Sequence, residues 1–170
     1  KTIKDKCILD KINLELFEGD IYSLIGANGA GKSSLMKVIV NLYRMSEGEK
    51  IQKENLKIGY LPEHIYLYRD VKVIDLLYYF AELAHLSKDE AREKIKKLSK
   101  IFDFSVSLPK KFEELSGGNI QKLGIIVTFL RDCDLYILDE PTTALDPVSR
   151  EKLFDYLNEI CKNNNAAVLI

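Results

Sequence analysis

The chain has 170 residues and a mass of 19.5 kDa, with 46% hydrophobic and 30% charged residues. This size and composition predict one compact domain with a good core, and two independent domains are not expected. The formal net charge of −1 and the pI near 6.2 give no reason to expect sequence-independent binding to nucleic acid. The apolar runs are far shorter than the roughly 20 residues that cross a bilayer, so no membrane span is expected.

Three cysteines, Cys7, Cys133 and Cys161, are widely spaced and form no Cys-x-x-Cys pair. This pattern favours neither a disulfide framework nor a zinc site. We therefore expect reduced, mostly buried thiols in a cytosolic protein.

The first third of the chain predicts a hairpin that leads into a glycine-rich loop. Residues 12–17 alternate apolar and polar side chains, as a half-buried strand does, and a turn at 18–20 leads to a second strand at 21–25. After the loop, apolar residues recur at helical spacing from Leu35 to Leu42. Residues 56–61 predict another short strand.

The middle of the chain predicts helices. An apolar stripe at helical spacing covers residues 73–84, and Ser87 with Glu90 fits a capping box that begins a second helix. Residues 70–104 therefore predict a helical insertion. A further helix is expected to begin at Ser116.

The last third returns to alternating strands and helices. Residues 135–138 predict a buried strand, Asp146-Pro147 has the form of a helix start, and residues 166–170 predict one more buried strand. Near-continuous apolar strands that alternate with helices predict an α/β fold, with a mainly parallel sheet covered on both faces.

The glycine-rich loop, GANGAGKSS, fits the pattern G-x-x-x-x-G-K-[ST] between a strand and a helix. Glycines let backbone N–H groups turn inward around phosphate oxygens, while Lys32 reaches the terminal phosphates and the Ser33 hydroxyl ligates Mg²⁺. The plainer alternative is a glycine turn that matches by chance. The candidate phosphate-binding residues are Gly26, Ala27, Asn28, Gly29, Ala30, Gly31, Lys32, Ser33 and Ser34.

Two carboxylates follow the strand LYIL. Asp139 would lie beside the glycine loop, where it holds Mg²⁺ through water while Ser33 holds it directly. Glu140 is the candidate catalytic group that polarises the attacking water. The alternative is a solvated acidic pair that closes a strand.

A second glycine-containing helix start, LSGG, predicts a second anion site. Ser116, Gly117 and Gly118 would offer a hydroxyl and backbone N–H groups at the positive end of a helix. One nucleotide needs a single cradle, so the second is expected to serve the nucleotide of a neighbouring domain. An N-capped helix with a glycine turn is the plainer explanation.

Taken together, these motifs resemble those of the nucleotide-binding domain of ATP-binding cassette (ABC) transporters. The phosphate loop, LSGGNIQ, LYILDE and the loop Ala144-Leu145-Asp146 follow the family's order, from about residue 7 to the last residue. The resemblance implies a P-loop NTPase core with a mainly parallel sheet, a small N-terminal antiparallel β part and an inserted helical lobe at about 64–131. It also implies nucleotide contacts from Gln121 and Asp146.

The resemblance further implies ATP and Mg²⁺ as cofactors and two kinds of partner. A second ABC ATPase domain, identical or different, would stack head to tail with this one, and a transmembrane permease subunit would be moved by hydrolysis. The expected location is cytoplasmic, peripheral on the inner face of the cell membrane. Residues 1–170 are expected to be one domain, in a fragment that lacks the first strand and the C-terminal part.

The sequence departs from the family at several positions. Glu63 stands where a glutamine that senses Mg²⁺ and water is usual, and a carboxylate there is a candidate metal ligand. The form YLPE resembles the branch of drug, bacteriocin and polysaccharide exporters with separate membrane subunits. The aromatic residue that stacks on adenine would fall near Ile3, and neither His64 nor His85 occupies the place of the switch histidine.

The leading interpretation is an ATPase that powers export through a separate transmembrane subunit. One alternative is a soluble ABC ATPase of translation or DNA repair. The other is a nucleotide-binding sensor with little hydrolysis, which the substitution at Glu63 and the missing histidine leave open.

Overall fold

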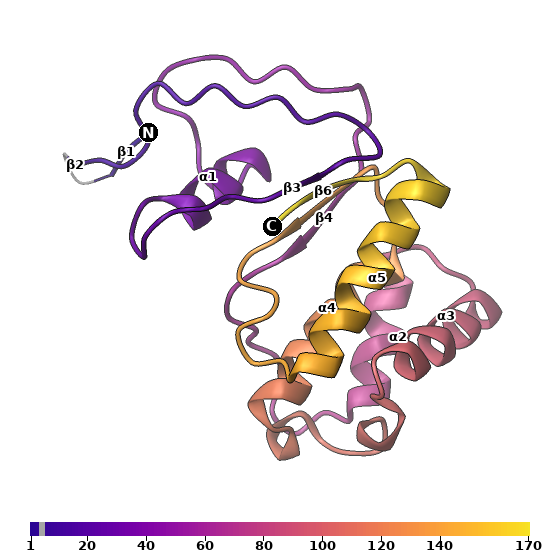
Figure 1. Cartoon of the computed structure of the whole chain (residues 1–170). Helices are drawn as coiled ribbons and strands as arrows, with labels where there is room; N and C mark the ends of the chain where they lie inside the picture. Colours follow the sequence, from indigo (N-terminus) through magenta and orange to yellow (C-terminus); the bar gives the residue numbers. More distant parts are fainter. Residues whose placement is uncertain (4–5) are drawn as a thin grey trace.

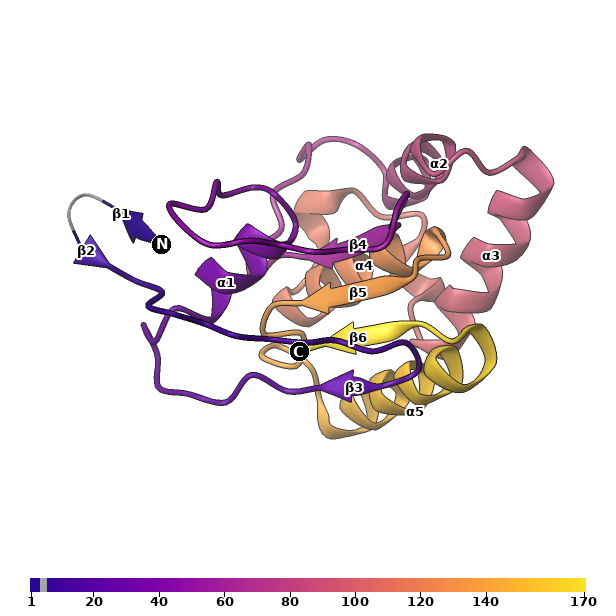
Figure 2. The same ribbon diagram turned by 90° about the horizontal axis from the view of Figure 1, so that it is seen from above.

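The computed structural model describes residues 1–3 and 6–170, with side chains described for residue 1 and residues 7–170. Its centre is a four-stranded sheet in which all neighbours run parallel (Figures 1 and 2). The strand order is β3 (Ile21–Tyr22), β6 (Ala167–Leu169), β5 (Leu135–Leu138) and β4 (Ile58–Leu61). The expected parallel α/β sheet is confirmed.

Helices cover both faces of this sheet, with α1 (Lys32–Ile39) on one side and α4 (Gly117–Leu130) and α5 (Pro147–Asn164) on the other (Figure 1). The alternation of β5 explains the layering. Leu135 and Ile137 belong to the smaller core with Met36 of α1, while Tyr136 and Leu138 belong to the larger core. All four residues of β5 are buried, as a central parallel strand requires.

The predicted helical insertion consists of α2 (Val73–Leu83) and α3 (Lys88–Ile101). The capping box is confirmed: Ser87 Oγ accepts from Glu90 N at 3.4 Å, and Glu90 Oε2 accepts from Ser87 N at 2.8 Å. Two short 3₁₀ helices, η1 (Ser105–Ser107) and η2 (Phe112–Glu114), then lead to α4. Among the described residues, no helix combines the length and apolar character needed to cross a bilayer.

The predicted N-terminal hairpin is wrong. Residues 12–17 are not assigned to any strand, and Phe17 is 61% exposed. β3 ends at Tyr22, and Ile25 is 95% exposed rather than buried. The alternating pattern indicates an extended chain, but a strand also needs a backbone partner, and the Phe17 N–H donates instead to Tyr22 Oη at 2.9 Å.

The small antiparallel part of the fold lies nearer the N-terminus than the sequence indicates. β1 (Thr2–Ile3) pairs with β2 (Lys6–Cys7) as a two-stranded ribbon apart from the main sheet. Two strands this short supply few backbone bonds, so the parallel sheet and its helices determine the fold around the site.

Candidate functional site

The glycine-rich loop joins β3 to α1, and its backbone has the shape that glycine favours. Gly29 and Gly31 have φ of +82° and +97°, the region that side chains rarely adopt. Gly31 is also the N-cap of α1, and α1 has no side-chain cap. The first N–H groups of α1 therefore have no side-chain acceptor, which is the condition for binding an anion at a helix start.

Lys32 folds back over this loop. Its Nζ donates to the carbonyl oxygens of Gly26 at 2.8 Å and Ala27 at 3.3 Å. An ammonium group has three N–H donors, so these two bonds leave one for a further acceptor. The side chain thus places a positive charge at the mouth of the loop.

Ser33 and Asp139 bring the two ends of the motif set together, although 106 residues separate them. Ser33 Oγ donates to Asp139 Oδ1 at 3.0 Å. The parallel register of β4 and β5 positions the aspartate, because Asp139 N donates to Leu61 O at 2.9 Å just beyond the last paired residues. The predicted proximity of these two residues is confirmed by this contact.

Asp139 is only 2% exposed, and its second carboxylate oxygen, Oδ2, is buried without a hydrogen-bond partner. Burial raises the pKa of this carboxyl above its ordinary value, the hydrogen bond from Ser33 lowers it, and the nearby charge of Glu63 raises it further. A buried carboxylate with a vacant acceptor position needs a cation or a donor.

A divalent cation fits this pair. A serine hydroxyl and one aspartate are oxygen ligands of the kind that Mg²⁺ takes, with the remaining positions filled by water and phosphate oxygens. In the described part of the chain, no group of three or more His, Cys, Asp or Glu side chains forms a metal cage. One hydroxyl and one carboxylate suit an Mg²⁺ ion whose other ligands are water and phosphate oxygens.

Glu140 lies directly after Asp139 and is exposed, with φ of +51°. Positive φ is uncommon for a residue other than glycine and is found often at functional turns. Glu140 Oε2 accepts from Thr143 Oγ1 at 3.3 Å. No sequence pattern singles out Thr143, because a hydroxyl three residues beyond a carboxylate is a common turn arrangement.

Glu63 lies near this site without touching it. Its charge contributes to the raised pKa of Asp139, yet its carboxylate is half exposed and lies 3.8 Å from His64 Nε2. Among the described contacts, none joins Glu63 to Ser33 or Asp139. The side chain of Ile3 lies outside the described part of the chain.

The second glycine motif begins α4 as predicted. Ser116 is the N-cap and its Oγ accepts from Asn119 N at 3.4 Å, while the residue stays exposed. A Cβ on Gly118 would lie 2.9 Å from the backbone oxygen of Ala144, so this glycine allows α4 to approach the loop after Glu140. In the described residues, no hydrogen bond or ion pair joins residues 116–121 to residues 26–34.

Gln121 and Asp146 serve the fold in this structure. Gln121 is buried and its Nε2 donates to Pro141 O at 3.1 Å, which ties α4 to the same loop. Asp146 caps α5 by accepting from Ser149 N at 2.9 Å and Ser149 Oγ at 2.6 Å, which lowers the pKa of Asp146 to about 2. Nucleotide contacts from these two residues would require their side chains to leave these bonds.

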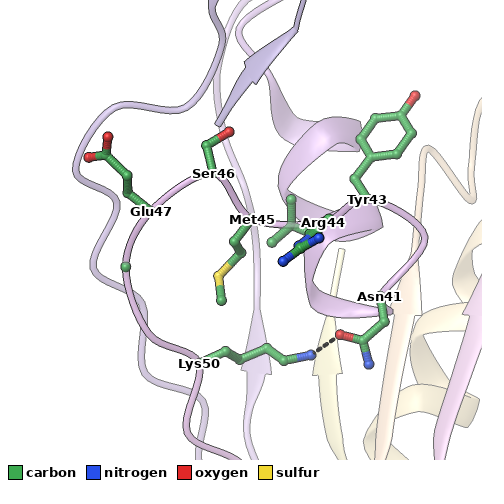
Figure 3. A pocket seen from close by; sticks show the side chains of 9 residues that line it. Asn41, Tyr43, Arg44, Met45, Ser46, Glu47 and Lys50 are labelled. Carbon is green, nitrogen blue, oxygen red and sulfur yellow. Dashed lines mark hydrogen bonds between the residues drawn. The ribbon is translucent and has the colours of Figure 1, made fainter.

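A pocket of about 390 Å³ lies away from this site (Figure 3). It lies beyond the C-terminal end of α1, where Lys50 Nζ donates to Asn41 Oδ1 at 2.5 Å and to Ile39 O at 3.0 Å. Its lining includes neither the glycine loop nor Asp139 or Glu140. At the candidate site, residues 26–30 are exposed, whereas Ser33 is partly buried and Asp139 is buried.

Comparisons with known proteins give the chain its family. The sequence profile described as "ABC transporter" matches residues 9–143, more than half of the chain. An uncharacterised ABC transporter ATP-binding protein of Methanocaldococcus jannaschii is 38% identical over 169 residues, covering 99% of this chain and 64% of that protein. The nucleoside import ATP-binding protein NupA of Lactococcus lactis is 33% identical, covering all of this chain and 37% of its own length.

A solved structure described as the ATP-binding subunit of an ABC transporter has a TM-score of 0.88 and 28% identity. The match covers 98% of this chain and 74% of that one. The fold is therefore that of a P-loop NTPase, as the resemblance implied. The chain spans less than two thirds of the length of the two relatives described above. It belongs to the ABC transporter ATP-binding family.

Proposed function

We propose that this chain binds ATP with Mg²⁺ and hydrolyses it to power a membrane transporter. The observation that carries the proposal is the 3.0 Å bond from Ser33 to Asp139, beside the unpartnered Oδ2 of Asp139. A serine at the start of a helix and a buried aspartate at the end of a neighbouring strand form the Mg²⁺ end of a nucleoside triphosphate site. Membership of the family supports the same conclusion.

In this proposal, residues 26–34 hold the triphosphate. The N–H groups of the loop and of the first turn of α1 donate to phosphate oxygens, and the positive end of the helix favours their charge. Lys32 exchanges its bonds to the carbonyls of Gly26 and Ala27 for the terminal phosphates. In the nucleotide-bound state, Lys32 then binds phosphate oxygens instead of the carbonyl oxygens of its own loop.

Ser33 and Asp139 hold the cation, and Glu63 contributes to its surroundings. Bound Mg²⁺ would neutralise charge that develops on the β- and γ-phosphate oxygens. Glu140 accepts the proton of a water whose oxygen attacks the γ-phosphorus in line, while the bond to the β–γ bridging oxygen breaks, giving ADP and phosphate. Glu140 lies in the turn that follows β5, with φ of +51°, and is exposed, whereas Asp139 is buried.

A second ABC ATPase domain completes the site. Ser116, Gly117 and Gly118 lie at a helix start where Ser116 and Gly117 are exposed, and no hydrogen bond or ion pair among the described residues joins them to residues 26–34; we place them on the nucleotide of a neighbouring copy. Gln121 and Asp146 support that surface from within. Residues 1–170 form one ATPase domain in this proposal, with a helical lobe at about 64–131.

The finer part of the proposal is export through a separate transmembrane subunit, with the chain peripheral on the cytoplasmic side of the membrane. The YLPE form at residues 60–63 supports this direction, because it resembles the exporter branch. The name of the NupA relative refers to import, so similarity of the ATP-binding chain alone does not determine direction. Direction is decided by the membrane subunit.

Two variants of the full-length protein test the proposal. Lys32→Ala is expected to abolish nucleotide binding, measured by equilibrium titration with a fluorescent ATP analogue. Glu140→Gln is expected to keep binding but to stop phosphate release and trap a dimer with ATP, measured by size-exclusion chromatography. Undiminished phosphate release from Glu140→Gln, or retained affinity in Lys32→Ala, would contradict the assigned roles.

A pull-down from detergent-solubilised membranes tests the partner. Co-purification with an integral membrane protein supports the transporter, whereas co-purification with ribosomes would favour a soluble ATPase. Transport assays in vesicles then determine the direction. Export corresponds to movement of substrate out of right-side-out vesicles or into inverted vesicles.

A further inference from the structure

Three side-chain polar atoms in the described part of the chain are buried without a hydrogen-bond partner: Tyr60 Oη, Ser99 Oγ and Asp139 Oδ2. A buried oxygen that has lost water and gained no partner destabilises the folded chain. Asp139 has a functional reason for this, since its free oxygen faces the proposed cation. None of the family motifs explains the hydroxyl of Tyr60. A phenylalanine would fill the same space without burying an unpartnered oxygen.

Strand register places Tyr60 beside Asp139. β4 and β5 run parallel, with Tyr60 opposite Ile137 and Leu61 opposite Leu138, and Asp139 N bonds to Leu61 O one residue further on. Side chains alternate along each strand, so Tyr60, Ile137 and Asp139 share one face of the sheet. Diagonal neighbours on one face are within reach of a long aromatic side chain.

That shared face is the one covered by α1, which carries Ser33. Tyr60 packs against the smaller core with Met36 and Ile137, and Asp139 accepts its hydrogen bond from Ser33 on the same side. The two unpartnered oxygens and the serine hydroxyl are therefore all on the α1 side of the sheet.

The phenol of Tyr60 stays protonated at neutral pH and is thus neutral, with an oxygen that can accept a hydrogen bond. Burial is the largest cause that raises the pKa of Tyr60, to about 12, and the nearby groups Asp139, Tyr43 and Glu63 act in the same direction, in that order. A neutral hydroxyl adds no negative charge beside these carboxylates, and its oxygen can accept from a water molecule that the carboxylates also orient.

We propose that Tyr60 is a positioning residue for the divalent cation, because its hydroxyl oxygen accepts from a water bound to the cation, whose other hydrogen Asp139 Oδ2 accepts. The inference rests on the proposed cation site of Ser33 and Asp139. One bridging water satisfies both buried oxygens at once, and Mg²⁺ keeps several of its waters when bound. The hydroxyl then destabilises the fold when no cation is bound and makes a hydrogen bond when the cation is bound.

The test is the change Tyr60→Phe, which removes one oxygen and keeps the ring. The matched control is Tyr156→Phe, the same change at a buried tyrosine of α5 on the other face of the sheet. Mn²⁺ affinity is measured by electron paramagnetic resonance on the full-length protein saturated with a nonhydrolysable ATP analogue. Analogue affinity without metal and urea unfolding without ligands are measured on the same samples.

We expect Tyr60→Phe to weaken Mn²⁺ binding about fivefold, the factor for one net hydrogen bond. Its metal-free analogue affinity should match wild type, and its urea midpoint should be equal or higher, because an unpartnered buried oxygen has gone. Tyr156→Phe should leave Mn²⁺ affinity unchanged. Unchanged Mn²⁺ affinity in Tyr60→Phe, or a urea midpoint below wild type that reveals a protein partner for the hydroxyl, would overturn the inference.

A further variant separates this inference from the function on which it rests. Asp139→Asn should lower Mn²⁺ affinity far more than Tyr60→Phe does. If Asp139→Asn leaves Mn²⁺ affinity intact, the cation site itself is refuted. If Asp139→Asn weakens Mn²⁺ binding while Tyr60→Phe does not, the proposed function stands and only the role of Tyr60 fails.

Discussion

The change Asp139→Asn should make the protein more stable without Mg²⁺ and less stable with it. Asp139 is 2% exposed and leaves Oδ2 buried without a partner, so its ionised form is held at a cost to the fold. An asparagine keeps an oxygen for the bond from Ser33 and removes the charge. A buried polar atom without a partner costs about 1–3 kcal/mol.

We take the lower end of that range for the gain in stability, because the Nδ2 of asparagine would replace Oδ2 and would itself be a buried polar atom without a partner. The variant should thus gain about 1 kcal/mol without metal, or roughly 2–4 °C in Tm for a chain of this size. Saturating Mg²⁺ at 100 times its Kd should add about 2.7 kcal/mol to wild type and little to the variant. The variant is therefore expected to be about 1 kcal/mol more stable than wild type without Mg²⁺ and roughly 2 kcal/mol less stable than wild type at this Mg²⁺ concentration.

The pH dependence has a definite sign. The pKa of Asp139 is raised in the folded chain, so the folded state holds this proton more tightly than the unfolded state does. The stability contributed by this group is complete below its ordinary pKa of 3.8 and is lost as pH rises through the raised value. The gain in Asp139→Asn should consequently appear only above that window and vanish below it.

The assay is thermal unfolding by calorimetry of both full-length proteins with a nonhydrolysable ATP analogue, before and after addition of Mg²⁺. The decisive quantity is the increment in Tm that Mg²⁺ produces. An equal increment in wild type and variant would show that Asp139 does not hold the cation. A variant that is less stable than wild type without Mg²⁺ at neutral pH would show that Oδ2 has a partner within the fold.

Two further predictions concern helix starts. Gly118→Ala should lower the free energy of unfolding by about 1–3 kcal/mol in urea titrations, because its Cβ would lie 2.9 Å from the Ala144 carbonyl oxygen, whereas Gly117→Ala, with nothing within 4 Å, should not lower it. Equal effects of the two changes would refute the close approach of α4 to the loop. Ser87→Ala should cost about 1 kcal/mol in the same measurement by removing the cap of α3, and an unchanged urea midpoint would contradict the capping box.

The local sequence signals predicted those parts of the fold that local physics determines. The caps at Ser87, Ser116 and Asp146 each begin a helix at the expected residue, because the capping bonds join residues only three apart. The buried strand at 135–138 was likewise predicted, since both of its faces are covered and its apolar run is continuous.

The failures came where partners distant in sequence decide the structure. Residues 12–17 have the alternation of a strand but no partner in the sheet, and Ile25 is apolar yet exposed. Alternation reports only which sides an extended chain presents, and strand pairing needs a neighbour that the pattern does not identify.

The candidate site divides in the same way. The glycine loop and the pair Asp139-Glu140 were predicted from motifs, whereas the contact of Thr143 with Glu140 and the unpartnered hydroxyl of Tyr60 were not. The register of β4 against β5 puts Tyr60 near Asp139, and no pattern within residues 58–61 could indicate it. A tyrosine in a half-buried strand reads as an ordinary strand residue.

One short path of contacts joins the two proposed anion sites of the chain. Ser33 donates to Asp139, and Asp139 is followed by Glu140 and Pro141. The carbonyl oxygen of Pro141 accepts a hydrogen bond from Gln121 Nε2. Gln121 lies in the second turn of the helix that Ser116 caps. The proposed cation ligand and the helix start proposed to meet a neighbouring domain are therefore linked through residues 139–144. Because residues 139–144 continue from β5 and are tied to α4 through the bond from Gln121 to Pro141, we expect a movement of Asp139 to displace α4 or to strain the turn at Glu140.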